Sequence, residues 1–195
     1  MTVNDGREKI LEASKAYFYT NGYNNTGIAD ILKQARLTKP SLYHHFGSKQ
    51  GLGMAYLQQQ ELEIFSIFER WAAEKATLRD YLHTWSKIVK RNAAAHKFHG
   101  CPFANFAQQM NSDDFSFFGS ALNGIEDRWK NLLMNFFERL KKENKLKAEV
   151  DNYGLGLEVL TIFQGSNTLW RMTANLKYLD DMNTLYHTLC DRVEA

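Results

Sequence analysis

Proline and cysteine are both scarce in this chain of 195 residues. The two prolines are Pro40 and Pro102, which leaves long stretches of the chain free to form helices. The two cysteines, Cys101 and Cys190, are too few for a disulfide framework. This scarcity favours a helical protein of a reducing compartment, and we expect a cytoplasmic location.

Long apolar runs and an export signal are missing as well. The chain has no run of 18 apolar residues, so we expect no membrane span. The first five residues lack the apolar stretch of a signal peptide. Hydrophobic residues nevertheless make up 44% of the chain, which is enough for a folded core and argues against disorder.

Charge is nearly balanced overall but unevenly distributed. The net charge is +2, and residues 1–50 hold seven Lys or Arg against four Asp or Glu. Residues 37–49 contain no carboxylate at all. The basic excess therefore lies in the part of the chain that contains the carboxylate-free residues 37–49. An excess of this size does not by itself indicate a function.

Apolar residues recur at helical spacing throughout the chain, and no strand-like alternation stands out. Asp5 is expected to cap the first helix, and Gly22 to end it in the left-handed conformation. We expect Thr26, Thr38 and Ser48 to cap the next three helices.

The remaining sequence predicts five further helices, of which the eighth is capped by Asp151. The fold class is therefore all-α, with a three-helix head and a six-helix body. We place the head at residues 1–50 and the body at residues 51–195.

Residues 37–49 predict a short helix that follows another short helix after a tight turn. Leu42 and Phe46 are its inward residues, so hydroxyl, imidazole, phenol and ammonium groups remain outside. Many donors without negative charge suit the edge of a DNA duplex. Packing within the head is the alternative for Tyr43 and His45. The candidate DNA-contacting residues are Thr26, Arg36, Thr38, Lys39, Ser41, Tyr43, His44, His45 and Lys49.

The first 55 or so residues resemble the head of the TetR/AcrR family of transcriptional regulators. The string Leu-Tyr-His-His-Phe-Gly-Ser-Lys, at its distance from Asn-Gly-Tyr, is the most specific part of this resemblance. This sequence departs from the family pattern at Arg36 and Pro40, where the family commonly has glycine. The matching residues are Arg7, Ile10, Leu11, Ala13, Phe18, Gly22, Tyr23, Thr26, Ile28, Asp30, Ile31, Ala35, Thr38, Lys39, Leu42, Tyr43, Phe46, Lys49 and Leu52.

The resemblance implies a homodimer that binds a palindromic operator, usually as a repressor, and a body that binds a variable ligand. It implies a helix-turn-helix DNA-binding domain at residues 1–50 and a ligand-binding and dimerisation domain at residues 51–195. Small residues at 154, 156, 165 and 166 and an apolar seam of Leu185 and Leu189 are candidates for the dimer contact. Packing within one subunit is the alternative for these residues.

Most aromatic side chains of the body are expected to form ordinary core. A bundle of this size also has room for a cavity between helices, and few ionisable groups interrupt its aromatic faces. We therefore expect a small, apolar effector. The candidate lining residues are Trp85, Phe103, Phe106, Trp129, Phe163 and Trp170.

Cys101 precedes Pro102 at the start of a short helix, where free amides and the helix dipole favour a thiolate. The Gly-Cys-Pro-Phe-Ala-Asn segment resembles one in a TetR subgroup that responds to electrophiles, so Cys101 is a redox-sensing candidate. A small buried residue is the alternative. His96, His99 and Cys101 have ligand-like spacing without an evident fourth ligand, so we expect no metal and no cofactor.

Two other classes of protein are alternatives for this sequence. An enzyme is disfavoured because no P-loop, nucleophile elbow, zinc-protease or dinucleotide motif is present. The paired carboxylates at 113–114 and 180–181 are interpreted as caps or exposed turns. An interaction module with a vestigial helix-turn-helix is disfavoured by the intact Lys39, Tyr43 and Lys49.

Overall fold

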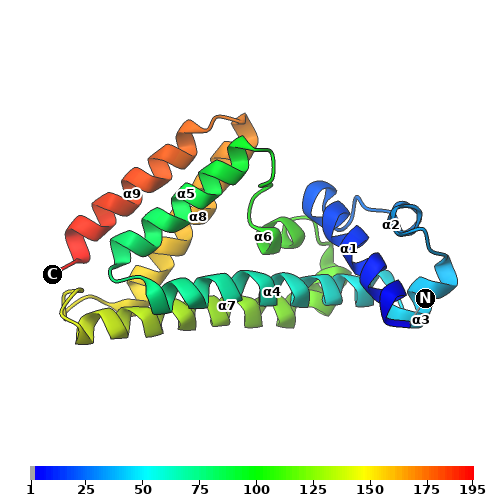
Figure 1. The fold of residues 1–195 in the computed structure, drawn as a ribbon, viewed down its shortest axis with the longest axis horizontal. Helices are drawn as coiled ribbons and strands as arrows, with labels where there is room; N and C mark the ends of the chain where they lie inside the picture. The colour runs from blue at the N-terminus through cyan, green and yellow to red at the C-terminus, as the bar shows by residue number, and fades with distance from the viewer. Residues whose placement is uncertain (1–2) are drawn as a thin grey trace. The chain divides into compact units, whose positions relative to one another are not determined.

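A computed structural model describes residues 3–195, which fold into nine helices (Figure 1). Within these described residues, extended pairing is limited to one isolated bridge between Leu146 and Glu194. The predicted all-α fold is confirmed. The helices are α1 (Val3–Asn21), α2 (Ile28–Ala35), α3 (Lys39–Phe46), α4 (Lys49–Glu74), α5 (Leu78–Ala94), α6 (Pro102–Ala107), α7 (Ser112–Lys142), α8 (Asn152–Thr173) and α9 (Lys177–Val193).

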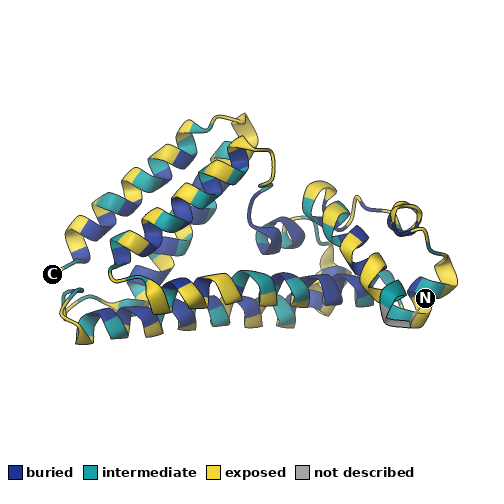
Figure 2. Cartoon of the chain, in the orientation of Figure 1, coloured by how far each residue is buried: buried dark blue, intermediate teal, exposed yellow. Residues whose placement is uncertain are grey.

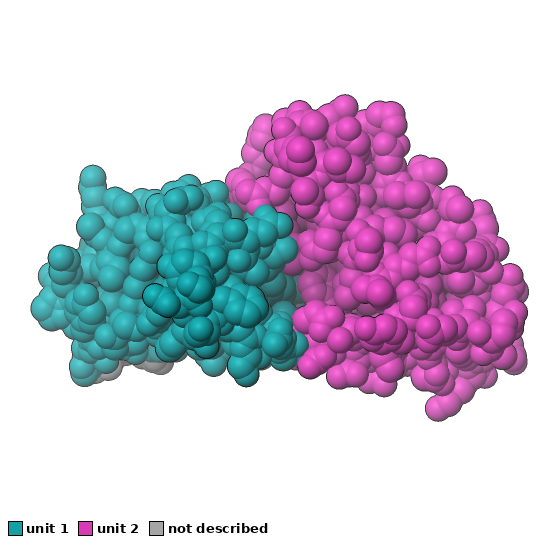
Figure 3. Space-filling view, turned by 180° about the vertical axis from the view of Figure 1, so that it is seen from behind, with its two compact units in different colours: residues 1–64, 102–125 teal, residues 65–101, 126–195 magenta. Residues whose placement is uncertain are grey.

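The chain divides into two compact units, which Figure 3 colours separately. The first unit comprises residues 1–64 and 102–125, and the second comprises residues 65–101 and 126–195. Residues 51–64 and 102–125 thus group with the three head helices, although the sequence assigned them to the body. The functional boundary at residue 50 stays a prediction.

An aromatic cluster explains why α6 and the start of α7 group with the head. The ring centroid of Tyr23 lies 4.8 Å from that of Phe106 in α6 and 5.2 Å from that of Phe118 in α7. Gly53 of α4 lies against this cluster, since a Cβ there would come 2.9 Å from Tyr23 and 3.0 Å from Phe118. Burial of these rings supplies much of the apolar area that holds the first unit together.

Two of the predicted helix caps are wrong. Asp5 lies inside α1, where it pairs with Lys9 one turn later at 3.0 Å. Gly27, and not Thr26, is the N-cap of α2. Thr26 instead donates its hydroxyl to the carbonyls of Gly22 and Tyr17, because its side chain is buried and turned toward α1. The left-handed Gly22 at the end of α1 is confirmed by its φ of 86°.

The turn between α2 and α3 leads into the N-cap that the sequence predicted for α3, Thr38. Arg36 takes the left-handed conformation with a φ of 55° and is the C-cap of α2. Thr38 is the N-cap of α3, although its hydroxyl makes no capping hydrogen bond to the helix. Pro40 falls in the first turn of α3, where a missing amide hydrogen costs nothing. Ser48 caps α4 by accepting a hydrogen bond from the Gly51 amide at 2.9 Å.

The second unit is built around aromatic side chains of α4, α5, α7 and α8. The Trp85 ring centroid lies 4.5 Å from that of Phe163, 4.8 Å from that of Phe68 and 5.9 Å from that of Trp129. Asp151 caps α8, as predicted, by accepting from two backbone amides. Along α8 and α9, buried residues alternate with exposed ones, which leaves each helix one uncovered face (Figure 2).

Candidate nucleic-acid interface

The outer face of α3 carries the exposed polar residues that the sequence predicted. Leu42 is fully buried, and it holds the helix against the rest of the first unit. Lys39 and His44 are exposed, and the Tyr43 side chain is 52% exposed. Tyr43 therefore does not pack within the head, which was the alternative reading for this residue.

His45 and Phe46 lie on the flank of α3, and both are half-buried. A Cβ at Gly6 would come 3.1 Å from His45 Nε2, so this imidazole packs against the backbone of α1. The ring of Phe46 meets the Arg7 guanidinium, whose Cζ lies 5.3 Å from the ring centroid. Arg7 thus adds an exposed cation next to α3. Arg7 was not predicted as a contact residue, because it lies more than thirty positions before α3 in the sequence.

Lys49 has partners inside the first unit. Its Nζ lies 4.6 Å from the centre of the Tyr23 ring, a cation–π arrangement. Burial lowers the pKa of the Lys49 ammonium, and the neighbouring Asp114 carboxylate acts in the opposite direction. Burial, and secondly the same carboxylate, raise the pKa of the Tyr23 phenol. The Lys49 side chain is therefore half-buried, and the Tyr23 ring holds its ammonium group in place.

Thr26 stands apart from the other candidates. Its side chain is 2% exposed, and its hydroxyl hydrogen is engaged by carbonyl oxygens of the first unit. Arg36 and Thr38 are exposed in the turn, and Ser41 is half-buried behind Thr38, with the two hydroxyl oxygens 3.5 Å apart. The placement of Thr26 does not support a DNA contact through its hydroxyl.

The six predicted ligand-lining residues fall into separate groups. Trp85, Trp129 and Phe163 lie together in the second unit and are all buried. Phe103 and Phe106 are buried in the first unit, where Phe106 belongs to the Tyr23 cluster. The remaining residue lies farther along α8 and is half-buried: Trp170 stacks on Phe98 with ring centroids 5.4 Å apart.

Two buried polar side chains near these aromatics, Tyr81 and Asn167, have polar atoms without a hydrogen-bond partner among the described residues. Asn167 of α8 is 3% exposed, and neither its Nδ2 nor its Oδ1 has a hydrogen-bond partner among the described residues. The sequence gives no signal for Asn167, because a single Asn inside an apolar helix resembles a surface position. Buried carboxamides are normally paired, so this one marks an unusual place in the core.

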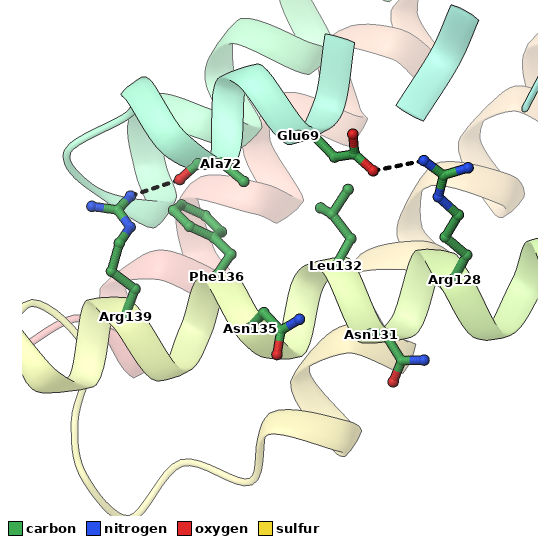
Figure 4. Close-up of a pocket in the computed structure, with 8 residues that line it drawn as sticks. All are labelled: Glu69, Ala72, Arg128, Asn131, Leu132, Asn135, Phe136 and Arg139. Atoms are coloured by element: carbon green, nitrogen blue, oxygen red, sulfur yellow. Dashed lines mark hydrogen bonds and ion pairs between the residues drawn. The ribbon is translucent and has the colours of Figure 1, made fainter. Parts of the chain in front are cut away.

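A groove opens between α4 and α7 within the second unit (Figure 4). It encloses about 380 Å³ and is lined by Asn131, Asn135 and two arginines. Arg128 pairs with Glu69 at 2.7 Å, and Arg139 donates to the backbone carbonyls of Ala72 and Lys75. Both guanidinium groups are therefore occupied in holding α7 to α4.

The uncovered faces of α8 and α9 bear on the predicted dimer contact. Leu157, Leu169 and Met172 of α8 are 51%, 44% and 75% exposed. Leu185 of α9 is 49% exposed, whereas Leu189 is buried within the subunit. A Cβ at Gly165 would meet no atom within 4 Å, so the backbone of α8 is open to close approach there.

Both cysteines are buried thiols that form no disulfide. Cys101 is 3% exposed and directly precedes α6. Cys190 lies on α9, where burial raises the pKa of its thiol to about 12. Within the described residues, no three His, Cys, Asp or Glu side chains lie close enough to hold a metal ion. In the same part of the chain, no helix is long and apolar enough to cross a membrane.

Comparison with known sequences bears first on the head. The family model of bacterial regulatory proteins, tetR family, matches residues 10–55. The transcriptional regulator AcuR of Cereibacter sphaeroides is 26% identical over 149 residues, which cover 74% of this chain and 66% of that protein. An uncharacterized HTH-type transcriptional regulator of Lactococcus lactis is 26% identical over 192 residues, covering 96% of this chain and 94% of that protein.

Solved structures extend the likeness to the whole fold. A TetR-family transcriptional regulator from Cytophaga hutchinsonii superposes with a TM-score of 0.88 at 18% identity, over 100% of this chain and 98% of that one. The regulator CifR, a cysteine mutant in complex with 26-bp operator DNA, superposes with a TM-score of 0.78 at 17% identity, over 92% and 94% of the two chains. Residues 10–55 thus match the model of bacterial regulatory proteins, tetR family, and the described chain has the fold of solved TetR-family regulators.

Proposed function

We propose that this protein is a cytoplasmic, homodimeric transcriptional repressor that binds a palindromic operator and leaves it when a small effector binds the body. The observation that carries the proposal is the outer face of α3, where Lys39, Tyr43 and His44 are exposed above a buried Leu42. A recognition helix needs such a face, with an apolar anchor below and base-reading groups above.

Electrostatics support the same face. No Asp or Glu occurs between residues 31 and 60, so α2, the turn, α3 and the start of α4 carry no acid beyond Asp30. Arg36 in the turn and Arg7 beside α3 add cations at the flanks. Lys49 has the Asp114 carboxylate nearby, but the segment of residues 31–60 contributes no carboxylate of its own. Cations in such a segment attract phosphates along a duplex, which supplies affinity and fixes orientation. The proposed contact set is Arg7, Arg36, Thr38, Lys39, Ser41, Tyr43, His44, His45 and Lys49, without Thr26.

Dimerisation through α8 and α9 follows from their exposed apolar residues. Monomeric proteins rarely leave several large apolar side chains uncovered on one helix face. An isologous contact buries the same patch on both copies and sets two α3 helices against one palindrome. The CifR neighbour, which is in complex with 26-bp double-strand operator DNA, supports DNA binding by a chain of this fold.

Two routes of release remain within the proposal. The first is a small apolar effector that enters the aromatic region of the body, and the second is chemical modification of Cys101. The buried position of Cys101 means that an electrophile reaches its thiol only after the surrounding segment opens.

N-ethylmaleimide distinguishes the second route. If it acts through Cys101, the reagent releases operator DNA from the native protein and from Cys190→Ser, but not from Cys101→Ser. Equal release from all three proteins in a mobility-shift assay would exclude a sensing role for Cys101.

The proposal gives this chain no catalytic role, and the relatives that it matches are named as transcriptional regulators. A vestigial interaction module is the remaining alternative, and DNA binding separates it from a regulator. The test is a mobility shift with duplexes from the region around the protein's own gene, measured at 50 and 200 mM salt. We expect binding that is selective over unrelated duplex and that weakens by roughly a thousandfold or more at the higher salt. Equal affinity for unrelated duplex, or salt-independent binding, would contradict the proposal.

A further inference from the structure

Asn167 presents a complete but unused hydrogen-bonding group inside the second unit. Its side chain is 3% exposed, and both its Nδ2 donor and its Oδ1 acceptor lack a partner among the described residues. Removing a carboxamide from water without compensation destabilises a fold. A core position of this kind is explained if a molecule that binds there supplies the missing partners.

The neighbours of Asn167 on α8 are aromatic. Phe163 precedes it by one turn and is buried, with its ring centroid 4.5 Å from that of Trp85. Trp170 follows it by one turn and stacks on Phe98. Residues spaced by three and four positions share one face of a helix. Asn167 therefore lies between a closed aromatic cluster and an aromatic pair at its edge.

The edge of this region is formed by a non-helical segment. Residues 95–101 connect α5 to α6, and they include left-handed backbone at His96, with a φ of 55°, and at Gly100, with a φ of 100°. Phe98 of this segment and Trp170 are both half-buried. A connecting segment with few helical hydrogen bonds opens at lower cost than the flanking helices. The proposed entry to Asn167 therefore lies at the half-buried Phe98–Trp170 pair.

We propose that Asn167 is the polar, specificity-determining anchor of the effector site in the second unit. The effector is a small, neutral, largely aromatic or apolar molecule with one terminal group that offers an adjacent donor and acceptor, such as a primary amide or a lactam. This inference rests on the proposed function, because it identifies the chemistry of the molecule that releases DNA. A ligand with only an acceptor leaves half of the carboxamide unpaired and binds more weakly.

Three probe molecules of similar size test the pairing chemistry. Benzamide carries donor and acceptor, acetophenone carries an acceptor alone, and toluene carries neither. Binding is followed through tryptophan fluorescence, since Trp85 and Trp170 flank the site. The native protein should bind benzamide at least about tenfold more tightly than toluene, with acetophenone between them.

Asn167→Leu should remove this preference while raising Tm, because it replaces an unpaired buried carboxamide with an apolar group of similar size. Asn167→Ala should also remove the preference, because alanine has no hydrogen-bonding group and leaves more space at the site than leucine does. The matched control is Asn183→Leu. The Asn183 carboxamide accepts from Ser86 at 2.8 Å and lies 3.2 Å from His83 Nδ1, so its loss should lower Tm and keep the preference for benzamide.

The proposal is overturned if the native protein does not prefer benzamide to toluene, or if both Asn167 variants keep the preference. It is also overturned if Asn167→Leu lowers Tm as much as Asn183→Leu does. These measurements use the protein without DNA. A parallel mobility shift on the same variants should show unchanged operator affinity, and a failure there would count against the proposed function and not against the site.

Discussion

At the scale of single residues, Arg36 is the clearest case of a position with backbone strain. It holds a φ of 55° in the turn before α3, a conformation that side chains other than glycine adopt at a cost. Arg36→Gly should therefore raise the free energy of unfolding by about 1 kcal/mol, measured by urea denaturation. The same variant should bind operator more weakly, since a cation leaves the flank of α3. A variant that is less stable than the native protein would contradict the strain.

Cys190 gives a second prediction at this scale. Burial raises its thiol pKa to about 12, so the thiol stays protonated at neutral pH. The folded protein should leave Cys190 unmodified by iodoacetamide for hours, whereas the urea-unfolded protein should react quickly. Because the pKa of the Cys190 thiol is higher in the folded protein, the free energy of unfolding depends on pH. The stabilisation from the protonated thiol is fully present below the unfolded thiol's pKa near 9 and is lost as pH rises toward 12. Rapid modification of folded Cys101→Ser at neutral pH would refute this environment.

Single residues were also where the sequence predicted least well. Asp5 and Thr26 are residue types that often cap helices. However, α1 begins before Asp5, and the Thr26 hydroxyl donates a hydrogen bond to a carbonyl at the end of the preceding helix. Both residue types hydrogen-bond to several nearby backbone groups, and the tertiary packing selects among them. Ser48 and Asp151 were predicted correctly because each directly precedes a helix whose first amides lack other partners.

At the scale of elements, α4 approaches the aromatic cluster of the first unit through Gly53. A methyl group there would come 2.9 Å from Tyr23 and 3.0 Å from Phe118, and neither rigid ring can yield easily. Gly53→Ala should therefore cost about 1–3 kcal/mol, despite the roughly 1 kcal/mol by which alanine favours a helix.

Gly124 of α7 provides the matched control for this prediction. It is exposed, and an added Cβ would meet no atom within 4 Å, so Gly124→Ala should stabilise the protein by about 1 kcal/mol. Chemical denaturation of both variants measures the difference. If Gly53→Ala stabilised the protein as much as Gly124→Ala, the close packing between α4 and the cluster would be refuted.

Helical periodicity and turn residues were sufficient to predict the elements. The nine helices of residues 3–195 all occur where the apolar spacing placed them, with ends that differ by a few residues. The grouping of α6 and the start of α7 with the head could not be predicted in this way. It depends on contacts between Tyr23, Phe106 and Phe118, which are distant in sequence, and periodicity carries no information on such pairings.

At the scale of the whole molecule, the exposed faces of α8 and α9 predict the oligomeric state. The double variant Leu157→Glu/Met172→Glu places charge on the proposed contact and should convert a dimer into a monomer. Leu62→Glu is the control, since Leu62 of α4 is 66% exposed and lies outside the proposed contact. Light scattering after size exclusion measures both. A native protein that is monomeric at micromolar concentration, or a dimer lost in Leu62→Glu, would contradict the assignment.

The central claim is that α3 reads DNA, and operator affinity tests it most directly. A duplex selected from random sequence by the native protein is titrated with the native protein, with Lys39→Ala/Tyr43→Ala, and with Lys177→Ala. Lys177 lies on α9, where it pairs with Asp181. We expect the double variant to lose at least about tenfold in affinity for the selected duplex, because it removes two groups from the reading face. Lys177→Ala should bind as the native protein does. A double variant that binds the selected duplex as tightly as the native protein would contradict the account.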